Sequence, residues 1–168
     1  MSEESSVLKQ LKNMVGKEMV VTAPEEVGQA SIRYFAKAID DLNPVYFDEK
    51  YAKNTRHQGI IAPPTFVCES MQYLVGDVDE VGGPARRLRL PVGTEIRGGN
   101  DYEFFQPLRP DDIMTAHWKV LDVYEKTGQK YGKMYFLVYD ITYTNQRNEL
   151  LAVNHEWLIF LESDSNQN

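Results

Sequence analysis

The sequence is poor in cysteine, and Cys68 is the only one among 168 residues. A disulfide framework needs paired cysteines, so a small disulfide-stabilised secreted scaffold is excluded. No apolar run approaches the ~20 residues that a membrane-spanning helix needs. The N-terminal stretch MSEESSVLKQ lacks the basic and apolar regions of a signal peptide. These absences predict a cytoplasmic protein that does not enter the membrane, with Cys68 as a core residue.

Positive charge is also scarce, because the chain has 18 basic and 25 acidic residues and a net charge of −7. This balance argues against a general nucleic-acid-binding surface or an anionic-membrane surface. An anionic ligand must therefore be met by a local cluster, and the densest is ARRLRL, which contains Arg86, Arg87 and Arg89. A solvated strand edge or loop is the alternative for such a charge run. We expect neither a metal nor a cofactor.

Aromatic and aliphatic residues are plentiful, with ten Tyr, seven Phe and two Trp in a chain that is 42% hydrophobic. This composition excludes a disordered chain, and the length fits one globular domain. We therefore predict a single domain over residues 1–162. The low-complexity tail, residues 163–168, is expected to be frayed.

The first half of the chain has helical periodicity. A first helix is predicted over residues 2–17, and its buried stripe comprises Val7, Leu8, Leu11, Met14 and Val15. EMVVT then reads as a short strand. A second helix opens on Pro24 and ends before Asn43-Pro44, because proline disfavours a helical conformation in the residue before it. Its predicted buried face comprises Ile32, Phe35, Ala36 and Ile39.

The second half alternates with period two and predicts four long antiparallel strands. In MYFLVYDITYT the predicted buried face comprises Tyr135, Leu137, Tyr139, Ile141 and Tyr143. In ELLAVNHEWLIFLE it comprises Leu151, Val153, His155, Trp157, Ile159 and Leu161. The turns PLRPDD, KTGQKYG and NQRNE are predicted to join successive strands as hairpins.

One run, PPTFVCESMQYLV, is apolar over more of its circumference than the first two helices and predicts a central, buried helix. Helices followed by a run of strands indicate an α+β domain. The predicted architecture is the hot-dog fold, in which a curved antiparallel sheet wraps a long central helix, here with additional N-terminal helices.

Three blocks of the sequence resemble the MaoC-like and FAS1-type dehydratases. YFAKAIDDLNPVYFD resembles their hydratase signature, in which a helix ends in Gly-Asp-x-Asn-Pro-aliphatic-His. GIIAPPTF resembles the segment that enters the central helix, and the stretch from GTEIRGG to LDVYEK resembles the second and third strands of the MaoC N-terminal domain subfamily. The likeness covers residues 15–160, with the blocks in the family's order. It implies a protein that adds water to, or removes it from, the acyl thioesters of coenzyme A or acyl carrier protein.

The resemblance assigns roles to single residues. Asp41 takes the place of the signature Asp, Asn43 that of the Asn, and Tyr46 that of the catalytic His. A neutral imidazole accepts a proton near pH 7, whereas a phenol with a pKa near ~10 is protonated there and offers mainly a hydrogen bond. Asp41 would then lack its acid/base partner. Asp40 and Asp41 could also serve only a turn, and Asn43 could only tie the loop.

The thioester oxygen needs hydrogen-bond donors, which the family supplies at the N-terminus of the central helix. Pro63 and Pro64 stand here where many catalytic members have His-Gly, and proline has no N–H to donate. The remaining donors are the N–H groups of Thr65 and Phe66. The predicted substrate contacts are Ala62, Pro63, Pro64, Thr65 and Phe66, with Arg86 and Arg87 for the charged part of the thioester.

The histidines are not expected to replace the missing one. His57 is predicted to lie in an exposed loop, and His155 to be a core residue on an apolar strand face. His117 falls within a strand.

Three functions remain open from the sequence. The first is an enoyl-CoA hydratase or 3-hydroxyacyl dehydratase that uses Asp41 with Tyr46 or a water. The second is a catalytically silent acyl-CoA-binding subunit, whose hot-dog partner supplies Asp and His. The third is a hot-dog acyl-CoA thioesterase. In each case we expect a dimer, either a homodimer or a heterodimer with another hot-dog subunit.

Overall fold

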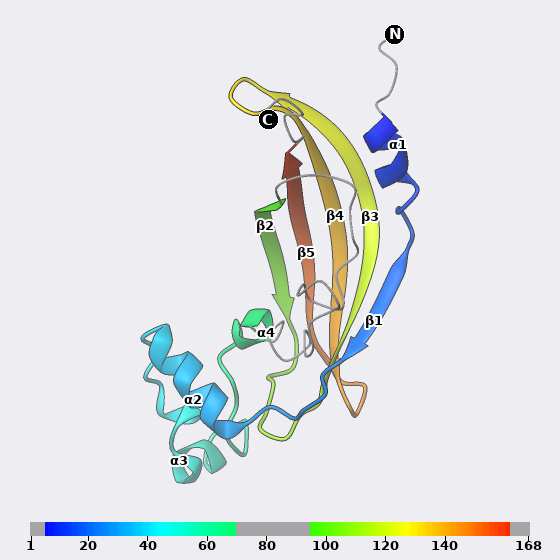
Figure 1. The fold of residues 1–168 in the computed structure, drawn as a ribbon. Helices are drawn as coiled ribbons and strands as arrows, with labels where there is room; N and C mark the ends of the chain where they lie inside the picture. The colour runs from blue at the N-terminus through cyan, green and yellow to red at the C-terminus, as the bar shows by residue number, and fades with distance from the viewer. Residues whose placement is uncertain (1–5, 70–94, 162–168) are drawn as a thin grey trace.

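The computed structural model describes residues 6–69 and 95–161, with one curved antiparallel sheet and short helices (Figure 1). The strands are β1 (Glu18–Thr22), β2 (Glu95–Phe104), β3 (Met114–Gly128), β4 (Gly132–Asn145) and β5 (Leu150–Leu161). The helices are α1 (Ser6–Lys12), α2 (Gln29–Ala38), the 3-10 turn η1 (Pro44–Tyr46), α3 (Glu49–Lys53) and α4 (Phe66–Glu69). In Figure 1, α1 lies beside β3, and α2 and α3 project from one end of the sheet.

The five strands are ordered β1-β3-β4-β5-β2, and all neighbours are antiparallel. The hairpins predicted at KTGQKYG and NQRNE are confirmed, since they join β3 to β4 and β4 to β5. The hairpin predicted at PLRPDD is wrong, because β2 pairs with β5 and not with β3. Its loop instead crosses the end of the sheet, where the Leu108 carbonyl accepts the Ala62 N–H and the Asp111 N–H donates to the Val27 carbonyl. These long-range bonds take up backbone groups that a tight hairpin would have paired locally.

β4 forms the centre of the core, as its alternation predicts. Its inward side chains, each no more than 7% exposed, are Tyr135, Leu137, Tyr139, Ile141 and Tyr143.

β5 differs from the predicted face. Tyr143 pairs with Ala152 but Thr144 pairs with Leu150, so Leu151 is an extra residue in β5. Such a bulge reverses which residues point inward along the rest of a strand. Ala152 and Asn154 are therefore buried, while His155 is exposed. The prediction that His155 is a core residue is wrong, and its Nδ1 lies 3.2 Å from Asp140 Oδ1.

The N-terminal helices are shorter than predicted. α2 begins at Gln29 rather than at Pro24, because Val27 is held in an extended pairing in which its N–H donates to the Asp112 carbonyl. Ile32 and Ala36 are fully buried as predicted, but Ile39 is 45% exposed because the helix has already ended. In α1 and the following turn, Leu8, Leu11 and Met14 are buried, whereas Val15 is 45% exposed.

Of the predicted central helix, the described residues include the helical turn α4. In Figure 1, α4 lies near the lower end of β2. The remainder of the predicted central helix, the pair Arg86 and Arg87, and the tail 163–168 lie outside the described residues. Within residues 6–69 and 95–161, no helix is long and apolar enough to cross a membrane.

Candidate functional site

The end of α2 positions the signature residues. The Asp40 N–H donates to the Lys37 carbonyl (3.1 Å) and the Asp41 N–H to the Ala36 carbonyl (2.9 Å), which is the paired hydrogen-bond pattern of a Schellman C-cap. Asp40 takes the left-handed conformation that this motif requires, with φ 57°. The resembling family has glycine at this position, and glycine adopts such a φ without a steric penalty. Asp40 is therefore a turn residue, and the turn leads into the loop that contains Asp41 and Asn43.

Substitutions at Asp40 test this geometry. We expect Asp40→Ala to be less stable than Asp40→Gly by about 1 kcal/mol, because alanine is strained at positive φ while glycine is not. Urea denaturation of the two variants measures the difference. Equal stability of the two variants would contradict a left-handed residue at this turn.

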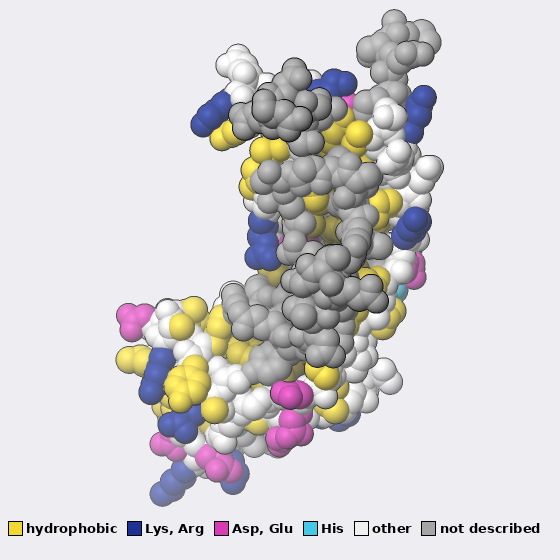
Figure 2. Space-filling view, in the orientation of Figure 1, with side chains coloured by type: hydrophobic (Ala, Val, Ile, Leu, Met, Phe, Trp, Pro, Cys, Tyr) yellow, Lys and Arg dark blue, Asp and Glu magenta, His cyan; other side chains and the backbone are white. Residues whose placement is uncertain are grey.

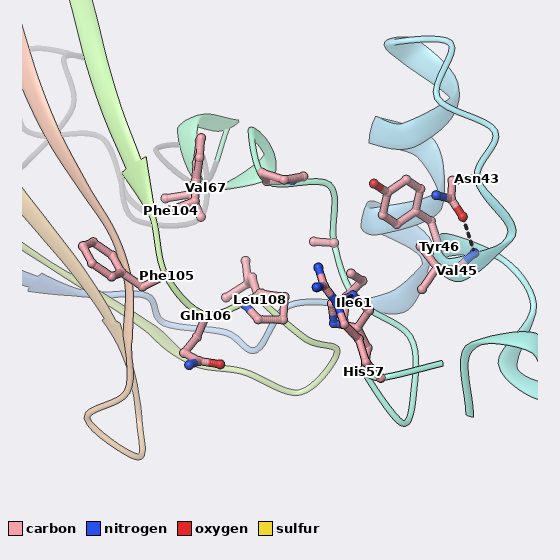
Figure 3. Close-up of a pocket in the computed structure, with 14 residues that line it drawn as sticks. Asn43, Val45, Tyr46, His57, Ile61, Val67, Phe104, Phe105, Gln106 and Leu108 are labelled. Carbon is pink, nitrogen blue, oxygen red and sulfur yellow. Dashed lines mark hydrogen bonds between the residues drawn. The ribbon is translucent and has the colours of Figure 1, made fainter. Parts of the chain in front are cut away.

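Asp41, Asn43 and Tyr46 form one local hydrogen-bonded unit. Asp41 Oδ1 accepts the Asn43 N–H (3.2 Å), and Asn43 Oδ1 accepts the Val45 N–H (3.1 Å) at the start of η1 (Figure 3). η1 in turn directs Tyr46, which is 7% exposed, into the wall of the site. The sequence spacing therefore brings the three predicted residues together, with Asn43 holding the loop.

The Tyr46 hydroxyl is a hydrogen-bond donor here. Burial raises the pKa of the Tyr46 phenol above its ordinary value. The negative charge of Asp41 and a hydrogen bond to its carboxylate raise this pKa further. A protonated phenol can orient a polar group, but it cannot accept a proton from water near neutral pH. The pair thus lacks the base that a histidine would provide.

The segment IAPPTF forms the opposite part of the site. The N–H of Ala62 donates to the Leu108 carbonyl (2.8 Å), which fixes the segment to the loop after β2. The N–H of Phe66 donates to the Pro63 carbonyl (2.9 Å). Of the two predicted donors, the N–H of Thr65 has no acceptor among the described residues. The Phe66 ring packs edge-on against Phe35 of α2, with centroids 5.3 Å apart.

A cavity of about 390 Å³ lies between these segments. In Figure 3, Val67, Phe104 and Phe105 lie on one side of it, and Asn43, Val45 and Tyr46 on the other. The other lining residues are Arg56, His57, Ile61, Ala62, Pro64, Gln106, Pro107 and Leu108. Most of this lining is apolar, with a few polar groups, as is typical of small-molecule sites. Of the predicted residues, Asn43, Tyr46, Ala62 and Pro64 line the cavity, whereas Asp41, Pro63, Thr65 and Phe66 do not.

Sequence reasoning missed two groups of cavity residues. His57 was predicted in an exposed loop, but it is half-buried and lines the cavity beside Arg56. Phe104 to Leu108 join the lining because the loop after β2 pairs with the segment that precedes α4 instead of forming a hairpin. The pair Phe104-Phe105 at the end of a strand was the one available signal, since both rings could not face the core of the sheet.

The fold and the site together define a hot-dog domain of the MaoC-like dehydratase class. A family model for the FAS1-like, dehydratase domain region matches residues 13–154, and the chain belongs to this family.

Three similar proteins illustrate the relationship. A UPF0336 protein of Streptomyces coelicolor is 36% identical over 105 residues, which are 62% of this chain and 67% of the relative. The crystal structure of a MaoC-like dehydratase from Rhodospirillum rubrum is 21% identical, with a TM-score of 0.66 over 88% of this chain and 92% of the other. The structure of the ChsH1–ChsH2 complex from Mycobacterium tuberculosis is 20% identical, with a TM-score of 0.68 over 95% and 92%.

Proposed function

We propose that this chain is the acyl-binding subunit of a two-subunit acyl-thioester hydratase or dehydratase. It binds the acyl chain of a 2-enoyl or 3-hydroxyacyl thioester, and a second hot-dog subunit supplies the acid/base pair. The observation that carries the proposal is Tyr46, a buried and protonated phenol at the position where the resembling family has its histidine.

The reaction explains why this position matters. In hydration, the oxygen of water bonds to the β-carbon, a base takes one proton of the water, and an acid gives a proton to the α-carbon. Asp41 has a carboxylate, but its neighbour Tyr46 already donates to it and cannot relay a proton near neutral pH. The chain therefore has one half of the pair that the reaction needs.

The remaining features of the site favour binding. The apolar lining, with Val45, Ile61 and Val67 among its members, is suited to an acyl chain. The N–H of Thr65 has no acceptor among the described residues, and the preceding residue, Pro64, lines the cavity. The ChsH1–ChsH2 complex, whose fold this chain shares, has two different components and supports a two-subunit arrangement.

The test compares the purified chain with the same chain co-expressed with a hot-dog subunit that carries the intact Asp-x-Asn-Pro-x-His signature. We expect the chain alone not to consume the enoyl absorbance of crotonyl-CoA or of a longer enoyl-CoA, and the pair to do so. Asp41→Asn should leave the activity of the pair largely unchanged, because catalysis uses the partner's residues.

Two results would contradict the proposal. Hydration by the isolated chain, abolished by Asp41→Asn, would establish a self-sufficient hydratase. Release of free thiol together with the free enoic acid, without a 3-hydroxyacyl product, would establish a thioesterase.

A further inference from the structure

The cavity has a positive rim although the protein is acidic. Arg56 is the only Lys or Arg among the fourteen described residues that line the cavity, and these fourteen include no Asp or Glu. The chain as a whole has a net charge of −7. In Figure 2, basic and acidic side chains are interspersed over the helical end of the molecule. The separation of Arg56 from acidic groups is therefore a local property of the cavity.

The Arg56 side chain is oriented by its neighbour. Arg56 Nε donates to His57 Nε2 at 3.3 Å, which requires that His57 accept with this nitrogen and carry its proton on Nδ1. Burial lowers the pKa of the His57 imidazole, and the charges of Arg56 and Arg109 lower it further. His57 thus stays neutral near pH 7 and remains an acceptor.

The backbone of His57 is fixed at both ends. Its N–H donates to Thr55 Oγ1 at 3.1 Å, and its carbonyl accepts from Arg109 Nη2 at 2.8 Å. The backbone that carries the His57 imidazole is therefore held by its own turn and by the loop after β2.

Two other arginines of the described residues pair with carboxylates, whereas Arg56 does not. Arg97 lies 3.5 Å from Glu156, and Arg147 lies 2.8 Å from Asp112, so both pair with carboxylates. The terminal nitrogens of Arg56 have no acceptor within residues 6–69 and 95–161. A guanidinium with a fixed orientation and free terminal N–H groups is suited to an oxyanion such as a phosphate.

We propose that Arg56, oriented by His57, binds the phosphate of a phosphopantetheine arm at the rim of the cavity, while the apolar lining takes the acyl chain. The inference rests on the proposed function, because the phosphate enters with the thioester of coenzyme A or of a carrier protein. Both sources have a phosphate at this end of the arm. His57 is a positioning residue that acts through Arg56.

The experiment measures binding by calorimetry with three saturated thioesters, which the hydratase reaction cannot consume. Octanoyl-CoA and octanoyl-carrier protein contain the phosphate, and octanoyl-pantetheine lacks it. We expect Arg56→Gln to weaken binding of the phosphate-containing ligands about tenfold to a hundredfold, in a salt-dependent way. Binding of octanoyl-pantetheine should not change. Arg33→Gln, an exposed charge on α2, is the matched control and should leave all three affinities unchanged.

The positioning role of His57 has its own readout. His57→Ala should reproduce part of the loss for octanoyl-CoA and none for octanoyl-pantetheine. His57→Gln should restore part of the affinity, because its amide oxygen can again accept from Arg56 Nε.

The outcomes separate the inference from the proposed function. A loss for octanoyl-CoA, for octanoyl-carrier protein or for both, with none for octanoyl-pantetheine, supports the inference. A loss for only one of the two identifies the source of the phosphate. An equal loss for octanoyl-pantetheine, or no loss for any ligand, overturns the phosphate site while leaving acyl binding intact. If the unaltered chain binds none of the three thioesters, the proposed function itself fails.

Discussion

Replacing Tyr46 with histidine is expected to raise the hydration of an enoyl thioester by the isolated chain at least about a hundredfold, because a positioned acid/base group contributes ~10²–10⁴ in rate. The substitution puts an imidazole next to Asp41, at the end of a turn that is already in place. An imidazole near its ordinary pKa of ~6.5 can exchange a proton with water and with the α-carbon, whereas the Tyr46 phenol cannot.

Two control variants isolate the role of the imidazole. Tyr46→Phe removes the hydroxyl and adds no base, so it should show no gain. Tyr46→His combined with Asp41→Asn should lose most of the gain of the single variant, because the two side chains act as a pair. Thermal unfolding followed by circular dichroism would confirm that each variant is folded, since Tyr46 is only 7% exposed.

An inactive but folded Tyr46→His variant would contradict the explanation that Tyr46 is the reason why the isolated chain lacks hydratase activity. The cause would then lie in the segment Pro63-Pro64, where two residues without N–H groups precede the donor Thr65.

Removing the carboxylate of Asp112 is expected to destabilise the fold by about 3 kcal/mol, because it leaves the Arg109 N–H without its acceptor and removes a charge-assisted hydrogen bond from Arg147. Asp112 is 1% exposed. Its Oδ2 accepts the Arg109 N–H and its Oδ1 accepts from Arg147 Nη2, both at 2.8 Å. Arg147 also donates to Glu149, which accepts from Asn145. This network joins the loop after β2 to the turn between β4 and β5.

The measurement is the midpoint of thermal unfolding, which should fall by about 6–12 °C for Asp112→Ala. Lys53→Ala is the control, because its pair with Glu49 is exposed on both sides and contributes ~0–1 kcal/mol. Asp112→Ala should also bind acyl thioesters more weakly, since Leu108, in the loop that Asp112 holds, lines the cavity. A midpoint within the error of the unaltered chain would show that the network does not hold the loop.

Local sequence determined much of the site. The spacing of Asp41, Asn43 and Tyr46 could be interpreted because a helix C-cap and an Asn-capped turn need only neighbouring residues. The inward face of β4 followed its alternation, because this central strand pairs regularly on both sides over most of its length. The family also followed from these local blocks.

Tertiary structure decided the rest. In β5, the set of side chains that points into the core changes at Leu151, where the strand has a bulge. The position of such a bulge depends on the partner strand, here β4, as well as on the pattern of β5 itself. The loop after β2 meets the segment that leads into α4 because of hydrogen bonds between residues far apart in sequence, such as Ala62 and Leu108. That meeting closes the cavity and places Arg56 and His57 on its wall. The sequence by itself thus determined the local turns and the strand patterns, whereas long-range pairing decided which loops share a cavity.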